Sequence, residues 1–294
     1  MADRDDIPDY HRTAVPASTQ IPKQGEKLNI LLVTRGHPFD RDGFFDIFDG
    51  NPQIQYSNVE HPAAQYMFTP EMADKFDCYV QYDMPGIKFG SDTPEYFEPP
   101  EFYKEGLRAM GEAGSPLVLL HHCAAAWPAW PEWAEIVGGQ FLYTPMQSRG
   151  IDCPDSGYNI DVVHRVSPAM DHPITLGIEP FDIEDEVYLS QVFEESVTPL
   201  LTSDWGFEQT NFYSAANAVV RGELNSNKDW HHPNGSNLIG WIKNYKNAPV
   251  VYLQCGDGPA AYKNPNFRRI LAQAIHWASS DEAKSWAREL NKSS

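Results

Sequence analysis

The first 120 residues of the chain alternate between short apolar runs and segments with helical spacing. The apolar runs have the length and composition of strands that are buried on both faces of a parallel sheet. They cover residues 28–34, 78–82 and 116–120, and a less apolar run at 54–59 can also form a strand. Between them, Thr69 and Pro70 predict the start of a helix over 70–76, and a second helix over 100–113 ends at Gly114. This alternation predicts an α/β fold built from right-handed crossovers.

The second half of the chain has a weaker pattern with longer polar stretches. Two prolines interrupt the helical pattern after Trp127, and we expect residues 137–159 to be irregular. Strands are predicted at 161–166 and 248–253, and a helix with regularly spaced apolar residues follows at 264–278. The pattern as a whole predicts an open, mostly parallel sheet with long loop insertions.

The length and composition suit a single domain of this class. We expect residues 1–27 to form a polar arm and residues 28–294 to form the domain. No segment approaches the roughly 18 consecutive apolar residues of a membrane span, and the first residues lack the features of a secretory signal. The four cysteines are far apart and form no C-x-x-C pair, which is typical of reduced thiols. These features predict a soluble, cytoplasmic protein with no membrane partner.

The charge of the chain is strongly acidic. Its 41 Asp and Glu residues against 22 Lys and Arg residues give a net charge of -19. This charge repels phosphate backbones, and no basic stripe offsets it, so we expect no nucleic-acid partner. Acidic surfaces mostly serve solubility, and the charge itself indicates no function.

The residues that follow each predicted strand are the first candidates for a functional site. Open parallel sheets bind their ligands beyond the carboxyl ends of the strands. The candidates with chemically useful side chains are His37, Phe39, Asp83, His121, His122, Cys123, Gln254, Cys255 and Asp257.

The turn after the fourth apolar run is the strongest of these candidates. We expect a helix to begin at Ala124 and to present free backbone N–H groups, which would keep a neighbouring histidine neutral. Side chains alternate along a strand, so His121 and His122 should point to opposite sides, with His122 in the site and His121 buried. The thiol of Cys123 could be a nucleophile, but a small packed side chain is the more common role at such a position.

A second group of candidates lies in the middle of the chain. Residues 183–188 read Ile-Glu-Asp-Glu-Val-Tyr, and we interpret them as a loop with three carboxylates. Either Asp185 or Glu186 could be a general acid or base, or all three could be solvated. Trp230 and His232 lie in a long polar segment, which is either an exposed loop or a lid that stacks on a sugar.

Six short motifs in this order resemble the ThuA-like (trehalose utilisation) family. They are His37-Pro38-Phe39, Tyr82 to Gly86, Leu120 to Ala124, His172 to Gly177, Asp185 to Tyr188, and the stretch from Val251 to Ala278. The resemblance covers residues 28–278. It implies the fold of class I glutamine amidotransferases, a flavodoxin-like sheet with helices on both faces, and a pocket for a carbohydrate.

The resemblance also bears on individual residues. His122 falls where the amidotransferase relatives carry their nucleophilic cysteine, so glutamine hydrolysis is not expected. The family usually has Gly-His after its last strand, whereas this chain has Gly256-Asp257. A carboxylate can replace a histidine as base or ligand, but it has a lower pKa and a harder oxygen donor.

The leading hypothesis is an enzyme of carbohydrate catabolism that acts on a sugar or keto-sugar by acid/base chemistry, as an isomerase, lyase or hydrolase. In this hypothesis His122 is the base, and Glu186 or Asp257 is the partner acid. The residues expected around the substrate are His37, Phe39, Tyr82, Asp83, His121, Tyr188, Trp230 and His232. No cofactor is required.

Two alternatives stay open. A divalent metal between His37, His122 and Asp257 could polarise a carbonyl, although no closely spaced ligand motif supports it. The protein could also bind a sugar without catalysis, in a regulatory role on the same fold. Many aromatic residues in loops leave a homodimer as a further expectation.

Overall fold

The computed structural model describes residues 27–90 and 93–293. The predicted polar arm therefore lies outside the described residues except for Lys27. No helix in the described part of the chain has the length and apolar character that crossing a membrane requires.

The parallel half of the main sheet contains the strands predicted from apolar runs. Its order is β2 (Ile54–Glu60), β1 (Leu28–Arg35), β3 (Cys78–Asp83), β6 (Leu117–Leu120) and β16 (Ala248–Leu253), and all neighbours are parallel. β3, β6 and β16 are buried along their whole length, which explains their nearly continuous apolar sequences. This strand order is the flavodoxin-like one, with switch points where ligands bind.

An antiparallel half continues the sheet beyond β16. It consists of β15 (Leu238–Tyr245), β13 (Thr198–Ser203), β10 (Gly157–Pro168) and β11 (Phe181–Leu189), and β14 (Tyr213–Ser214) pairs with β10. The interpretation of residues 183–188 as a loop is wrong, because they form most of β11. A buried Asp185 interrupts the alternating apolar positions of this strand, so the sequence pattern does not indicate a strand there.

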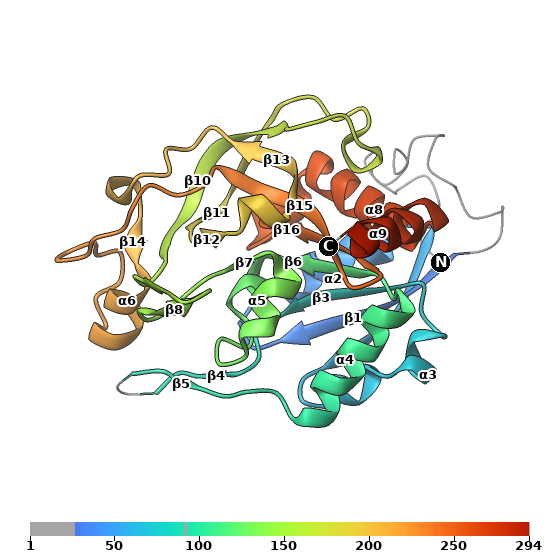
Figure 1. Cartoon of the computed structure of the whole chain (residues 1–294). Helices are drawn as coiled ribbons and strands as arrows, with labels where there is room; N and C mark the ends of the chain where they lie inside the picture. Colours follow the sequence, from blue (N-terminus) through green and yellow to red (C-terminus); the bar gives the residue numbers. More distant parts are fainter. Residues whose placement is uncertain (1–26, 91–92, 294) are drawn as a thin grey trace.

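Helices cover both faces of the sheet, as the resemblance implies (Figure 1). On one side α2 (Arg41–Asp49), α7 (Pro259–Lys263), α8 (Pro265–Ser279) and α9 (Asp281–Ser293) pack on one apolar core. On the other side α4 (Glu101–Ala113) and α5 (Pro131–Val137) pack on a second core, with the short α3 (Pro70–Ala73) beside α4. The helix boundaries predicted at Thr69 and Gly114 are confirmed, and the side chain of Asn264 caps α8.

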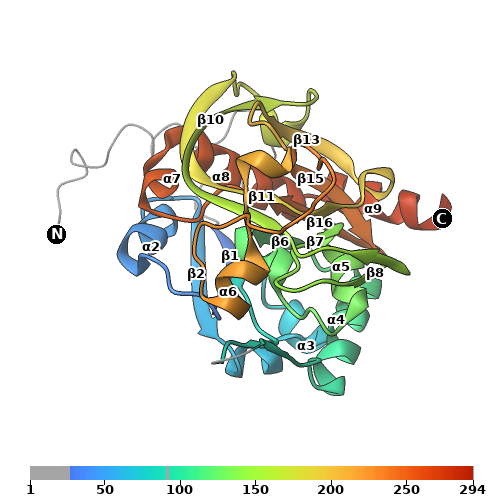
Figure 2. The ribbon, with the colours of Figure 1, turned by 90° about the vertical axis from the view of Figure 1, so that its left-hand side faces the viewer.

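The long insertions gather beyond the carboxyl ends of the parallel strands. In Figure 2, which is viewed from that end, α6 (Ala215–Arg221), β10 and β11 lie in front of the parallel strands. The remaining short elements are β4 (Ile87–Lys88), β5 (Glu95–Tyr96), β7 (Gly139–Gln140), β8 (Met146–Ser148), β9 (Ile151–Cys153), β12 (Gln191–Val192), and the 3-10 turns η2 (Ala63–Met67), η3 (His121–Ala125), η4 (Pro173–Thr175), η5 (Glu194–Ser196) and η6 (Gln209–Asn211). The insertions therefore enclose the edge at which ligands of this fold bind.

Candidate functional site

The 3-10 turn η3 places two histidines directly after β6. It begins at His121, whose φ is 39°, and all five of its residues are buried. The prediction of a helix starting at Ala124 is wrong, because the 3-10 turn ends at Ala125 and the next helix starts only at Pro131. The prediction that His121 and His122 point to opposite sides is also wrong. Strand alternation no longer applies within a turn, and the two rings lie 4.4 Å apart.

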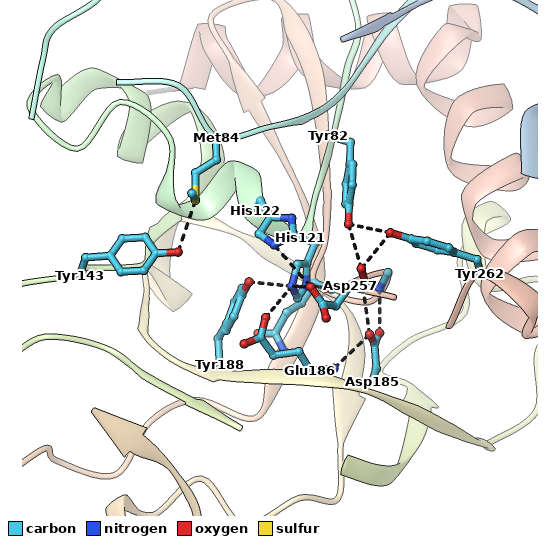
Figure 3. A network of polar contacts seen from close by, with 12 residues as sticks. Tyr82, Met84, His121, His122, Tyr143, Asp185, Glu186, Tyr188, Asp257 and Tyr262 are labelled. Carbon is cyan, nitrogen blue, oxygen red and sulfur yellow. Dashed lines mark hydrogen bonds and ion pairs between the residues drawn. The ribbon is translucent and has the colours of Figure 1, made fainter. Parts of the chain in front are cut away.

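His121 is the centre of a polar cluster (Figure 3). Its Nδ1 contacts the backbone oxygen of Gln254, so in the neutral ring the hydrogen is on Nδ1. Its Nε2 faces three oxygens: the Tyr188 hydroxyl at 2.6 Å, Glu186 Oε2 at 2.9 Å and Asp257 Oδ1 at 3.3 Å. The imidazole of His121, which we expected either as a buried residue or around the substrate, therefore joins several groups of the site.

His122 lies beside this cluster and lines an adjoining cavity. Its Nε2 is 3.4 Å from Asp257 Oδ1, and its ring stacks on His37 at a centroid distance of 4.0 Å. Its Nδ1 is buried and has no hydrogen-bond partner among the described residues. Burial and the charge of the neighbouring His121 lower the pKa of His122 to about 3, so its ring is neutral.

The electrostatics of the cluster depend on opposed effects. Burial alone would lower the pKa of His121, but hydrogen bonds and charges from Asp257 and Glu186 raise it well above its usual value. Burial opposes ionisation of Asp257, yet the hydrogen bonds from both histidines hold its pKa well below the usual range. The cluster therefore keeps charged groups in a nearly dry environment.

Side-chain directions alternate along β11, so its neighbouring carboxylates have different contacts. Glu186 and Tyr188 point toward His121, whereas Asp185 turns to the loop after β16. Asp185 accepts hydrogen bonds from the backbone N–H groups of Gly256 at 2.7 Å and of Asp257 at 3.0 Å. Burial raises the pKa of Asp185 to about 7, while the charge of His121 and these N–H groups oppose the rise. Asp185 is thus a positioning residue and Glu186 is part of the cluster.

A cavity of about 220 Å³ opens next to the cluster. Its lining residues are His37, His122, Phe141, Tyr143, Tyr158, Glu186, Tyr188, Ala215, Ala218, Val219 and Leu224. The walls are aromatic and apolar, and imidazole and carboxylate groups converge at one end. Sequence reasoning missed Phe141, Tyr143, Tyr158 and the residues of α6, because no local pattern marks residues that tertiary packing alone brings to a cavity.

Tyr82 and Phe39 support the site from behind. The Tyr82 hydroxyl lies 2.9 Å from the Tyr262 hydroxyl and 3.1 Å from the backbone oxygen of Asp257, and its ring packs edge-on against His122. Phe39 packs against the Tyr82 ring at 5.3 Å. Neither side chain lines the cavity, so the structure places them as supports of the residues that do.

Asp83 and Cys123 lie on the opposite face of the sheet from Tyr82. Asp83 Oδ2 is 2.8 Å from His61 Nε2, and the Asp83 side chain is fully buried. Cys123 donates from its thiol to the backbone oxygen of Gln81 at 3.2 Å, and burial raises its pKa well above the usual value. A buried, protonated thiol is a poor nucleophile, which agrees with a packing role.

Trp230 and His232 do not form an exposed loop or lid. Both side chains are buried, and the indole N–H of Trp230 donates to the backbone oxygen of Asp155 at 3.2 Å. Trp230 borders a second hollow, which also contains Asp155 and Asn217, rather than the cavity beside His122. The sequence around them is polar and does not indicate burial, although the Trp230 ring packs on Gly157.

The cluster also has the composition of a metal site. One ligand atom each from His121, His122, Glu186 and Asp257 lies within 4.8 Å of the others. This set differs from the hypothesis of His37, His122 and Asp257, because His121 and Glu186 take the place of His37. The predicted pair of His122 and Asp257 is brought together as expected.

Comparisons with known proteins agree with this architecture. The family model for ThuA, described as trehalose utilisation, matches residues 51–278. A putative ThuA-like protein from Parabacteroides merdae has a TM-score of 0.62 at 14% identity, covering 87% of this chain and 91% of that chain. A second one, from Bacteroides uniformis, has a TM-score of 0.55 at 16% identity, covering 90% and 94%.

A cytoplasmic protein from Salmonella typhimurium has a TM-score of 0.52 at 11% identity, with coverage of 85% of this chain and 99% of that chain. No curated protein matches the chain. At these identities the solved structures support the fold alone, and the flavodoxin-like prediction is confirmed.

Proposed function

The chain belongs to the ThuA (trehalose utilisation) family, and we propose that it is an enzyme of carbohydrate catabolism that acts on an uncharged sugar or keto-sugar by acid/base chemistry. The observation that carries this proposal is the cavity itself. It combines aromatic walls with the imidazole of His122 and the carboxylate of Glu186 at one end. The family indicates a sugar-related role, and the arrangement of the cavity favours proton transfer.

The walls of the cavity suit a carbohydrate. Phe141, Tyr143, Tyr158 and Tyr188 offer aromatic rings to the apolar face of a sugar, and the tyrosines also carry hydroxyl groups. The volume of about 220 Å³ is below the roughly 300–1,000 Å³ of pockets for drug-sized ligands. A single sugar ring is therefore the part of a substrate that we expect the cavity to enclose.

The charges around the cavity favour an uncharged ligand. Among the described residues that line it, none is Lys or Arg, whereas Glu186 lines it and Asp257 lies within the adjoining cluster. Phosphate and carboxylate groups are normally bound by Arg or Lys. Sugar phosphates and sugar acids should therefore bind poorly.

The chemistry follows from the groups at the polar end. His122 lines the cavity with a neutral ring, and we assign its imidazole as the base. His122 would take a proton from the carbon next to a carbonyl. The C–H electron pair would form a C=C bond, and the π pair of the carbonyl would move to its oxygen to give an enolate. Isomerisation follows when the proton returns to the former carbonyl carbon, while the hydroxyl on the deprotonated carbon passes its proton to the enolate oxygen and becomes the new carbonyl. Loss of an oxygen substituent from the next carbon, protonated as it leaves, gives elimination.

The decisive experiment detects proton abstraction directly. A thermal-shift screen of neutral sugars and their keto derivatives finds ligands, with sugar phosphates and uronic acids as the charged comparison. Each ligand that carries a carbonyl is then incubated with the protein in D₂O, and NMR follows deuterium uptake at the adjacent carbon. We expect uptake with the native chain and its loss in His122→Ala.

The control is His231→Ala, which changes an exposed histidine outside the cavity. Uptake that continues in His122→Ala would remove His122 from its role as base. Ligand binding without uptake or product would instead favour the noncatalytic sugar-binding alternative. Stabilisation by sugar phosphates alone would overturn the proposed ligand class.

A further inference from the structure

We infer that His121, Glu186 and Asp257 bind a divalent cation through Nε2, Oε2 and Oδ1, with His122 next to the cation but outside its ligand set. This inference rests on the proposed function to the extent that the cation would polarise the carbonyl oxygen of the substrate. The binding site itself is argued from geometry and hydrogen bonding alone.

The separations between the ligand atoms match those around a metal ion. His121 Nε2 is 2.9 Å from Glu186 Oε2 and 3.3 Å from Asp257 Oδ1. Bonds of about 2.0–2.2 Å from a metal to nitrogen and oxygen place neighbouring ligand atoms about 3.0–3.5 Å apart. Both separations from His121 Nε2 are thus close to this range, and one ligand atom each from Glu186 and Asp257 lies within 4.8 Å of the other.

The hydrogen bonds of His121 point to the same conclusion. Its Nδ1 contacts the backbone oxygen of Gln254, which leaves Nε2 as the nitrogen with the lone pair in the neutral ring. That lone pair faces the Tyr188 hydroxyl at 2.6 Å as well as the oxygens of Glu186 and Asp257, in a fully buried position. The Tyr188 hydroxyl can donate to this lone pair, but it brings no positive charge to the two carboxylates, whereas a cation among the three ligand atoms satisfies all of them. A backbone carbonyl on the other ring nitrogen is also the usual partner of a metal-bound histidine.

The same comparison sets His122 apart from His121. Its Nδ1 has no partner among the described residues, so it lacks the supporting bond that holds His121. His122 lines the cavity, whereas His121 lies behind it. A site with three protein ligands and an open position toward the cavity is the arrangement of catalytic rather than structural metal ions.

The surroundings hold the ligands in place and leave one side open. Asp185 accepts the backbone N–H groups of Gly256 and Asp257 and so positions the loop that carries the third ligand. The side chains of Glu186 and Asp257 keep 12% and 29% of their surface exposed. One nitrogen and two carboxylate oxygens suit Mn²⁺ or Zn²⁺, and the two carboxylates balance the charge of the ion.

The test measures metal binding without reference to turnover. The full-length chain is treated with chelator, dialysed, and titrated with Zn²⁺ and with Mn²⁺ by calorimetry, and metal content is measured by mass spectrometry. We expect one ion per chain. Glu186→Gln and Asp257→Asn should each weaken binding by more than about 100-fold, since even a change of a supporting residue usually costs 10- to 100-fold.

Two variants serve as controls. Glu184→Gln changes an exposed carboxylate on the same strand as Glu186 and should bind like the native chain. His122→Ala should also keep the metal. Circular dichroism checks that each variant is folded, and Asp257→Asn is the safer variant because its side chain is partly exposed.

The outcomes separate the two proposals. If neither metal binds stoichiometrically, or if both carboxylate variants bind like the native chain, the metal site is overturned. Loss of the metal in His122→Ala overturns the three-ligand set. Deuterium uptake that continues in chelator-treated protein without metal leaves the proposed function standing and rejects the role of the cation in polarising the carbonyl. Metal binding without deuterium uptake on any carbonyl sugar leaves the metal site standing and rejects the proposed proton abstraction.

Discussion

Asp185 on β11 accepts a hydrogen bond of 3.0 Å from the backbone N–H of Asp257, which follows the last parallel strand. The contact joins the antiparallel half of the sheet to the loop at the carboxyl end of the parallel half. The next residue, Glu186, faces the other way and touches His121. The two adjacent carboxylates therefore have different roles. Asp185 binds the loop that carries Asp257, and Glu186 contacts His121 in the cluster.

Replacing this acceptor should destabilise the fold. Asp185→Asn removes one of two oxygens and turns an NH₂ group toward a backbone N–H. A buried donor left without an acceptor costs about 1–3 kcal/mol, and we expect the free energy of unfolding to fall by this amount. Urea denaturation at pH 8 measures it. Asp182→Asn, an exposed position on the same strand, should change the value by less than about 0.5 kcal/mol.

The sequence predicts the parallel half of the fold well, because strands buried on both faces require continuous apolar runs. Val80 and Val118, for example, are fully buried between layers of helices. The antiparallel half gives a weaker signal. In β11 the alternation of Phe181, Ile183 and Val187 is interrupted by Asp185, whose burial depends on two N–H groups distant in sequence.

The candidate site could be predicted in place but not in detail. The turn after Leu120 follows from topology, since ligands bind beyond the ends of parallel strands. The orientation of His121 does not, because it depends on a 3-10 turn that starts one residue after the strand. The cavity walls at Phe141 and Tyr158 are set by packing between segments far apart in the sequence, which leaves no local pattern.

Tyr158 should control the mouth of the cavity. Its hydroxyl accepts a hydrogen bond of 3.0 Å from the backbone N–H of Asn225, next to Leu224 in the cavity wall. Tyr158→Phe removes this bond, which is worth about 1 kcal/mol, so that sugar binding must order the segment that carries Leu224. A sugar found by the thermal-shift screen should then bind more weakly by calorimetry, by at most roughly 5-fold. Tyr66→Phe changes a tyrosine that is 69% exposed and should leave the affinity unchanged. Equal affinities in the two variants would show that the bond has no influence on the cavity.

Cys123 should be chemically inert despite its position beside His122. All four cysteines are buried, and burial raises the pKa of the Cys123 thiol well above its usual value. Iodoacetamide should therefore leave the folded chain unmodified over minutes, while all four thiols react in urea, as mass spectrometry can count. Cys123→Ser should keep deuterium uptake within a few-fold of the native rate. Rapid labelling of Cys123 alone would indicate a reactive thiol and reopen its role as a nucleophile.

Stability should fall at mildly acidic pH through His164. This side chain is buried on β10, with Nδ1 2.8 Å from the Ser203 hydroxyl, and burial lowers its pKa to about 4. The unfolded chain has the ordinary value near 6.5, so the folded state excludes the charged ring. The stabilisation from the neutral ring is complete above pH 6.5 and is lost as the pH falls toward 4. At pH 4 the loss in the free energy of unfolding from this group amounts to at most about 3 kcal/mol.

His164→Gln isolates this contribution from the other acid-sensitive groups. The variant starts less stable at pH 7.5, because a buried contact is changed, but its free energy of unfolding should depend less steeply on pH between 6.5 and 4. Urea denaturation at several pH values gives both curves, and His231→Gln, at an exposed position, should parallel the native chain. The difference in slope corresponds to the uptake of one proton by the unfolded native chain. Parallel curves for His164→Gln and the native chain would mean that the folded state admits the charged ring.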